Sequence, residues 1–172
     1  MYDAVLVPVD ASPCSRRALL EACRVMAATH RHGEACTVYV LCVAATVGVG
    51  DLGPVALDPS CDAQAYVAEL EADMLARCKV TLDSAVEAAC AELQRLAGDA
   101  SDTMVIEPIV RQPDGATVAN VIVDAARENR VDVIVMGTHG RQGITRAIHG
   151  SVCEDVIRMS PVPVLGVHSD AC

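Results

Sequence analysis

The chain has 172 residues and a formal net charge of −10, and 52% of its residues are hydrophobic. The length suits one domain over residues 1–172, and the composition excludes a disordered chain and disfavours a nucleic-acid or anionic-membrane surface as the main function. Lys79 is the single lysine and no GxxxxGK[ST] string occurs, so any phosphate site must use backbone amides, hydroxyls and arginines.

The first predicted strand, Asp3–Val9, is an apolar run far too short to span a bilayer. Ser12 and Pro13 then form a strong helix start, with the Ser12 hydroxyl as N-cap and Pro13 at the first helical position. Gly33 supplies the end of this helix. The next predicted strand is Cys36–Val43.

Glycines and prolines interrupt the stretch Ala44–Ser60, which is predicted to be a long loop. The remaining elements alternate, and they are a helix over Asp62–Ala97 closed by Gly98, a strand over Met104–Val110, a helix from Pro113 to Asn129, a strand over Val131–Met136, a helix over Ser151–Met159 and a strand over Val162–Val167. This order predicts an α/β fold with a five-stranded, parallel, doubly wound sheet and right-handed crossovers. Ligands of such sheets bind outside the carboxyl ends of the strands, which here end near Asp10, Val43, Gln112 and Gly137.

Two patterns that resemble functional motifs have simpler explanations. Residues 48–53 read GVGDLG, but Pro54 and Pro59 follow, so no helix begins there to receive a dinucleotide pyrophosphate. His30 and His32 are two residues apart near a helix end, and with Cys36 they lack a fourth ligand, which favours a solvated helix terminus over a zinc site.

The nine cysteines are odd in number and include no CxxC, and no signal peptide is recognisable. This indicates mostly buried free thiols in a reducing cytoplasm. Redox sensing through a cysteine is an alternative function. Cys14 lies at a helix start near Arg16 and Arg17, where a thiolate would be stabilised, so this hypothesis is kept.

The segment Gly137–Ser151, GTHGRQGITRAIHGS, carries the strongest functional signal. It follows a buried strand, and Ser151 begins a helix whose free amides and positive dipole end favour an anion. Residues 133–153 contain Arg141 and Arg146 but no Asp or Glu. Four glycines would let backbone N–H groups approach a phosphate, although glycines at such a crossover can also serve only as turns: Gly137, Gly140, Gly143 and Gly150.

The spacing Gly137-x2-Gly140-x9-Gly150-Ser151 matches the G-2x-G-9x-G-(S/T) pattern of the ATP-binding branch of the universal stress proteins. DVIVMGTHG before it, LVPVDAS at the start and VPVLGV near the end resemble other segments of that family. The resemblance covers nearly the whole chain and implies a Rossmann-like, adenine nucleotide alpha-hydrolase-like fold with helices on both faces of the sheet.

The resemblance also implies a binding site for ATP, ADP or AMP, with Mg²⁺ as an optional companion ion. Asp10 and its neighbours match the family positions that hold adenine and ribose. Asp10 could instead serve only as a turn residue close to the Ser12 cap. The full set of implied contacts is Pro8, Val9, Asp10 and Val43 for adenine and ribose, Met136 and Gly137 for ribose, and His139, Gly140, Arg141, Gly150, Ser151 and Val152 for the phosphates.

The family's last strand commonly pairs with its twofold mate, and Val162–Val167 is an apolar edge strand that invites such pairing. We expect a homodimer whose nucleotide occupancy is read by a regulatory protein partner. A slow ATPase is the alternative, but the acid-free phosphate segment offers no convincing base, and His139 is better placed as a hydrogen-bond donor. We therefore expect no catalytic residues, no resident metal site and little or no turnover.

Overall fold

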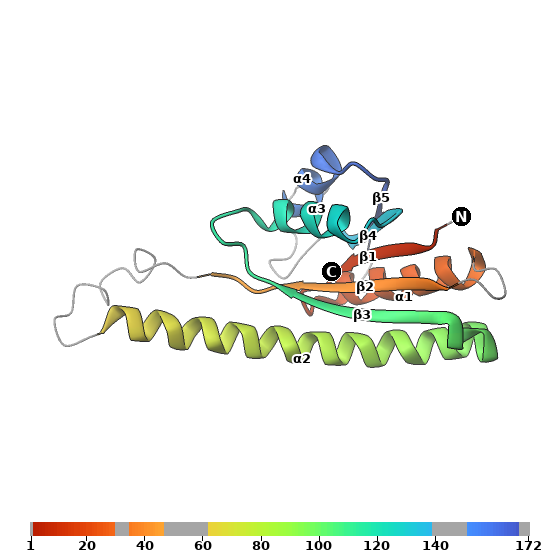
Figure 1. Ribbon diagram of the computed structural model, residues 1–172, viewed down its shortest axis with the longest axis horizontal. Helices are drawn as coiled ribbons and strands as arrows, with labels where there is room; N and C mark the ends of the chain where they lie inside the picture. The colour runs from red at the N-terminus through yellow and green to blue at the C-terminus, as the bar shows by residue number, and fades with distance from the viewer. Residues whose placement is uncertain (1, 30–34, 47–61, 139–150, 169–172) are drawn as a thin grey trace.

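The computed structural model describes residues 2–29, 35–46, 62–138 and 151–168, and Figure 1 shows their arrangement. Within them five strands form one sheet in the order β3-β2-β1-β4-β5, and each neighbouring pair is parallel. The predicted five-stranded parallel α/β fold is confirmed. The strands are β1 (Ala4–Pro8), β2 (Cys36–Val43), β3 (Met104–Arg111), β4 (Val133–Gly137) and β5 (Val164–Val167).

Helices cover both faces of this sheet. α1 (Pro13–Thr29) and α2 (Ala63–Ala97) lie on one face, and α3 (Val118–Glu128) and α4 (Ser151–Met159) lie on the other (Figure 1). Side chains of β1 alternate between the two faces of the sheet. Val5 and Val7 pack in the core under α1 and α2, and Leu6 packs in the core under α3 and α4. A short 3₁₀ helix, η2 (Gly98–Thr103), joins α2 to β3.

The order of connections creates a switch point beside β1. The chain runs outward from β1 through β2 to β3, then returns to add β4 and β5 on the other side of β1. Crossovers on either side of β1 therefore diverge at its carboxyl end, which is where doubly wound sheets bind ligands. β1 itself is fully buried at Val5, Leu6 and Val7, as its unbroken apolar run predicts.

Several helix boundaries follow the predicted caps. α1 begins at Pro13, and the Ser12 hydroxyl accepts a hydrogen bond from the Ser15 amide at 3.1 Å. Asp62, where the sequence placed the start of the next helix, is the N-cap of α2 and accepts hydrogen bonds from two amides. Gly98 closes that helix, as predicted, with a φ of 53°. The predicted end of α1 at Gly33 lies outside the described residues.

Three predicted elements begin two or more residues later than predicted, and most other boundaries differ by at most one residue. Pro113 opens a turn rather than a helix, because Asp114 and Gly115 adopt positive φ values of 43° and 84°, and α3 begins at Val118 after its Thr117 cap. β4 begins at Val133 instead of Val131, and β5 begins at Val164 instead of Val162.

The described helices include none that is both long enough and apolar enough to cross a membrane. α2 has the necessary length at 35 residues, but it carries charged side chains along its course.

Candidate functional site

The carboxyl ends of β1, β2 and β4 form a stepped edge. Pro8 ends β1 and pairs with Leu41, so β2 continues two residues further, to Val43. Continuing the β1–β4 register, in which Leu6 pairs with Ile134, places Met136 beside Pro8 and Gly137 one residue beyond it. The structure thus brings together four residues that the sequence assigned to adenine and ribose: Pro8, Val43, Met136 and Gly137.

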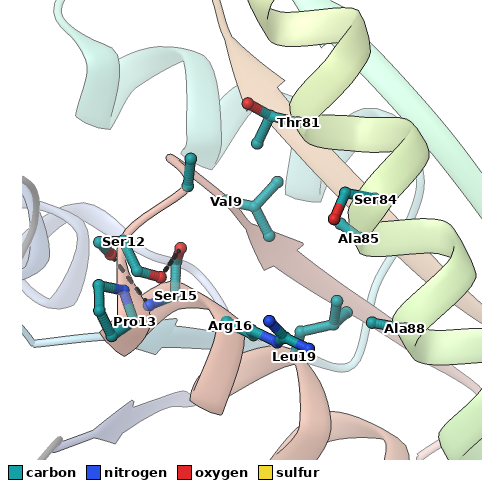
Figure 2. Close-up of a pocket in the computed structure, with 11 residues that line it drawn as sticks. Val9, Ser12, Pro13, Ser15, Arg16, Leu19, Thr81, Ser84, Ala85 and Ala88 are labelled. Atoms are coloured by element: carbon teal, nitrogen blue, oxygen red, sulfur yellow. Dashed lines mark hydrogen bonds between the residues drawn. The ribbon is translucent and has the colours of Figure 1, made fainter.

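Asp10 lies in the turn that joins β1 to α1. Its Oδ1 accepts a hydrogen bond from the Ser12 amide at 3.0 Å, and its own N–H donates to the Ser15 hydroxyl at 3.3 Å. Ala11 between them has a φ of 64°, which keeps the turn tight. Ser12 and Ser15 also bond to each other, as the dashed lines in Figure 2 show. The half-buried Asp10 carboxylate is therefore held in place at the end of β1, whichever role it has.

Val9 and Met136 face opposite helical layers. Val9 is 6% exposed and packs in the α1–α2 core, while its amide extends the sheet by donating to the Leu41 carbonyl at 2.8 Å. Met136 is 5% exposed and packs in the α3–α4 core. Neither side chain is open to solvent, so each can contribute to a ligand site mainly through its backbone and its packing.

The packing of α1 explains why position 137 is occupied by glycine. A Cβ built on Gly137 would lie 3.0 Å from the carbonyl carbon of Cys14 and 3.0 Å from its Sγ, which is tighter than nine in ten real Cβ contacts. The sequence singled out Gly137 for backbone approach to a ligand. The structure adds a packing reason that is independent of any ligand, because the first turn of α1 fills the space that a side chain would need.

A polar junction at the exits of β4 and β5 was missed by the sequence analysis. The Val167 carbonyl accepts hydrogen bonds from the Thr138 amide at 3.0 Å and from the Cys14 thiol at 3.2 Å. The Thr138 hydroxyl lies 3.1 Å from Nδ1 of His168. Thr138 directly follows Gly137, and a threonine after a buried strand was the available signal. The junction holds Thr138, the last residue described before the gap at residues 139–150.

The same junction bears on the redox alternative. Cys14 is 1% exposed, and its thiol donates a hydrogen bond to the Val167 carbonyl, so the structure offers no solvent-accessible thiol at this helix start. Burial and the neighbouring Cys14 raise the pKa of the Cys153 thiol. Burial likewise raises the pKa of Cys23 to about 12. Of the described cysteines only Cys90 is exposed, in agreement with the expectation of mostly buried free thiols.

The phosphate end of the predicted site is described only where α4 begins. Ser151 and Val152 are the first two residues of α4, and both are exposed. The amides of this first turn have no intrahelical partner, so the helix start keeps the anion-favouring character predicted for it. Four other predicted phosphate contacts lie outside the described residues: His139, Gly140, Arg141 and Gly150.

Comparisons with known proteins give a consistent result. The model of the universal stress protein family matches residues 1–168. The universal stress protein MJ0531 of Methanocaldococcus jannaschii is 49% identical over 49 residues, which make up 28% of this chain and 29% of that protein. The chain therefore aligns with less than a third of that relative's length.

Solved structures resemble the chain over nearly its whole length. UspA from Lactobacillus plantarum has a TM-score of 0.70 at 20% identity, covering 96% of this chain and 97% of that chain. A universal stress protein in complex with cAMP has a TM-score of 0.60 at 23% identity, covering 98% and 99%. The universal stress protein from Archaeoglobus fulgidus in complex with dAMP has a TM-score of 0.56 at 24% identity, covering 96% and 98%.

At these identities the structural likeness establishes the fold, while the family match extends over all but the last four residues. The five-stranded parallel sheet agrees with the structural likeness. The chain belongs to the universal stress protein family.

Proposed function

We propose that this protein binds an adenine nucleotide, ATP in particular, at the edge formed by β1, β2 and β4, and that it acts as a regulatory dimer with little or no turnover. The observation that carries the proposal is the convergence of Pro8, Val43 and Gly137 at the switch point of the sheet. Two structural neighbours in complex with cAMP and dAMP support the choice of an adenine nucleotide.

Each part of the edge suits one part of a nucleotide. Val43 offers an apolar, half-buried surface for adenine, and the fixed carboxylate of Asp10 can accept a hydrogen bond from a ribose hydroxyl or the adenine amino group. The amides of Ser151 and Val152, in the first turn of α4, have no partner within the helix and suit phosphate oxygens. His139, Gly140, Arg141 and Gly150 complete the phosphate contacts in the proposal, and any Mg²⁺ would bind mainly through the phosphates.

Little or no turnover is proposed because hydrolysis needs a group that orients or deprotonates the attacking water. Residues 133–153 contain no Asp or Glu. At the described edge, the Asp10 carboxylate follows β1, and one of its oxygens already accepts a hydrogen bond from the Ser12 amide. Occupancy by the nucleotide, rather than its cleavage, is therefore the proposed signal.

The proposed dimer forms through Val162–Val167. β5 is the edge strand of the sheet, and Leu165 on it is 40% exposed. Ile157 and Met159 on the adjacent α4 are 49% and 38% exposed, which adds apolar area beside that edge. A regulatory protein that reads the nucleotide state of the dimer, and a cytoplasmic location suited to the free thiols, complete the proposal.

Mass spectrometry of the supernatant from denatured protein names any resident nucleotide directly. Calorimetry with ATP should then give a dissociation constant in the micromolar range, about −8 kcal/mol. Gly140→Leu should abolish this binding by blocking backbone approach to the phosphates. The matched control is Thr145→Leu, in the nine-residue stretch that the pattern leaves free, and it should bind ATP within about threefold of the wild type. Equal ATP binding by Gly140→Leu and the wild type would show that the phosphate segment is misassigned.

A further inference from the structure

A cavity lies near the end of β1, on the opposite side of the sheet from α4. It has a volume of about 300 Å³ and lies between the first turns of α1 and the middle of α2 (Figure 2). Val9 contributes its inner wall, Leu19 and Arg16 come from α1, and Thr81 and Ser84 come from α2. This volume is at the lower end of the range for small-molecule sites.

The cavity exists because small residues face each other across the two helices. α2 presents Thr81, Ser84 and Ala85 at helical spacing, and the opposing turn of α1 presents Ser12 and Ser15. Further along the same two helices, Met26 of α1 and Leu93 of α2 are buried in the core. The hollow lies at the end nearest the β1–α1 turn, where Figure 2 shows Val9 between the two helices.

The chemistry of the wall is divided between apolar and polar groups. Val9 and Leu19 are 6% and 1% exposed and provide an apolar inner surface. Thr81 and Ser84 add two hydroxyl groups from α2. Arg16 adds a guanidinium group on the side of α1. A ligand that matched this wall would need an apolar body and a polar or anionic head.

Arg16 supports an anionic head. No carboxylate of the described residues lies within ion-pair distance of its guanidinium, although the chain carries 23 acidic residues against 13 basic ones. Arg24, two turns further along α1, pairs instead with Glu21 at 3.0 Å and with Glu92 at 3.5 Å. The guanidinium fork favours a carboxylate, which it can bind through two parallel hydrogen bonds.

We propose that the cavity between α1 and α2 is a binding site for a small monocarboxylate with an apolar body. The carboxylate pairs with Arg16 and accepts hydrogen bonds from Thr81 or Ser84, and the apolar body lies against Val9 and Leu19. One guanidinium suits a single negative charge and not a triphosphate. The proposed nucleotide site shares Val9 with this lining and otherwise uses the ends of β1, β2 and β4 and the start of α4.

Calorimetric titration with octanoate tests this site on the full-length protein. Octanoate should bind saturably with a dissociation constant below about 1 mM. Octanol has the same apolar body without the carboxylate and should bind at least about tenfold more weakly, since a hydrogen bond to a charged group is lost. Inorganic phosphate, an anion without an apolar body, should not bind in the cavity.

Arg16→Gln should weaken octanoate binding at least about tenfold while leaving octanol unchanged. Arg17→Gln is the matched control, since it removes the same charge from the next residue of α1, and it should change octanoate binding by less than about threefold. Ala85→Leu should fill the cavity and weaken both probes, with circular dichroism confirming that the variant is folded.

Three results would overturn the proposal: the absence of saturable octanoate binding to the wild type, equal octanoate binding by Arg16→Gln and the wild type, or equal losses in the Arg16 and Arg17 variants. A fourth is displacement of octanoate by ATP together with weaker ATP binding in Arg16→Gln, which would make the cavity part of the nucleotide site. ATP binding is measured separately in each variant, so the failure of either proposal is distinguishable from that of the other.

Discussion

Replacing Gly137 with alanine tests the packing that shapes the end of β4. The new Cβ would lie 3.0 Å from both the carbonyl carbon and the Sγ of Cys14. Favourable contacts between carbon atoms lie at about 3.5–4.0 Å, so the first turn of α1 must move by a few tenths of an ångström. That movement also disturbs the hydrogen bond from the Cys14 thiol to Val167.

The expected destabilisation follows from two opposing terms. Inserting a methyl group into a well-packed site costs about 1–3 kcal/mol. Gly137 does not have a positive φ, so alanine also restricts the unfolded chain and returns about 0.4–1 kcal/mol. We therefore expect Gly137→Ala to lower the free energy of unfolding by about 1–2 kcal/mol, which corresponds to a fall in Tm of roughly 2–8 °C.

Urea unfolding followed by circular dichroism measures this change. Gly166→Ala is the matched control, because its Cβ would approach one atom, the Thr138 Cγ2 methyl at 3.1 Å, on an edge strand that can yield. It should change the free energy of unfolding by less than about 0.5 kcal/mol. Cys14→Ala in the Gly137→Ala background should restore part of the loss by removing the Sγ contact. If Gly137→Ala were as stable as the wild type or more so, the packing explanation for Gly137 would be wrong.

Three further predictions concern other parts of the molecule. Ser12→Ala removes the cap of α1 and should lower the free energy of unfolding by about 1 kcal/mol in urea titrations, and an unchanged value would contradict the capping role. Folding raises the pKa of Cys23 from 9.0 to about 12, so the thiol loses its proton at a lower pH in the unfolded chain than in the folded one. Its contribution to the free energy of unfolding is therefore complete below about pH 9 and is lost as the pH rises toward 12. When the free energy of unfolding is measured from about pH 9 to 12, Cys23→Ala should show a smaller fall with pH than the wild type. Leu165→Lys should convert the proposed dimer to a monomer in analytical ultracentrifugation, whereas Val80→Lys, which alters a 69% exposed residue on α2, should leave the dimer intact.

Residues close in sequence predicted most of the fold, because the strongest capping residues mark where the helices begin and end. Ser12 and Pro13 at α1, and Asp62 and Gly98 at α2, act through bonds within a few residues. The error at Pro113 has the same local origin, since proline suits both the first turn of a helix and a β-turn. The following Asp114–Gly115 pair favoured the turn.

The candidate site was predictable at its strand ends and less so in its packing. The strand ends at Val43 and Gly137 follow from apolar runs and the family pattern. The burial of Cys14 depends on β5 packing against the start of α1, which are 153 positions apart at the Cys14–Val167 contact. The cavity depends on small residues of α1 and α2 facing each other. Neither relation leaves a local signature in the sequence.

Binding of ATP at the edge of β1, β2 and β4 is tested most directly by titrating ATP into isotopically labelled protein and following backbone amide resonances by NMR. We expect saturable shifts at Asp10, Val43, Gly137 and Ser151, with α2 residues such as Ser84 unaffected. The absence of saturable shifts, or shifts confined to the residues of the α1–α2 cavity, would contradict the account.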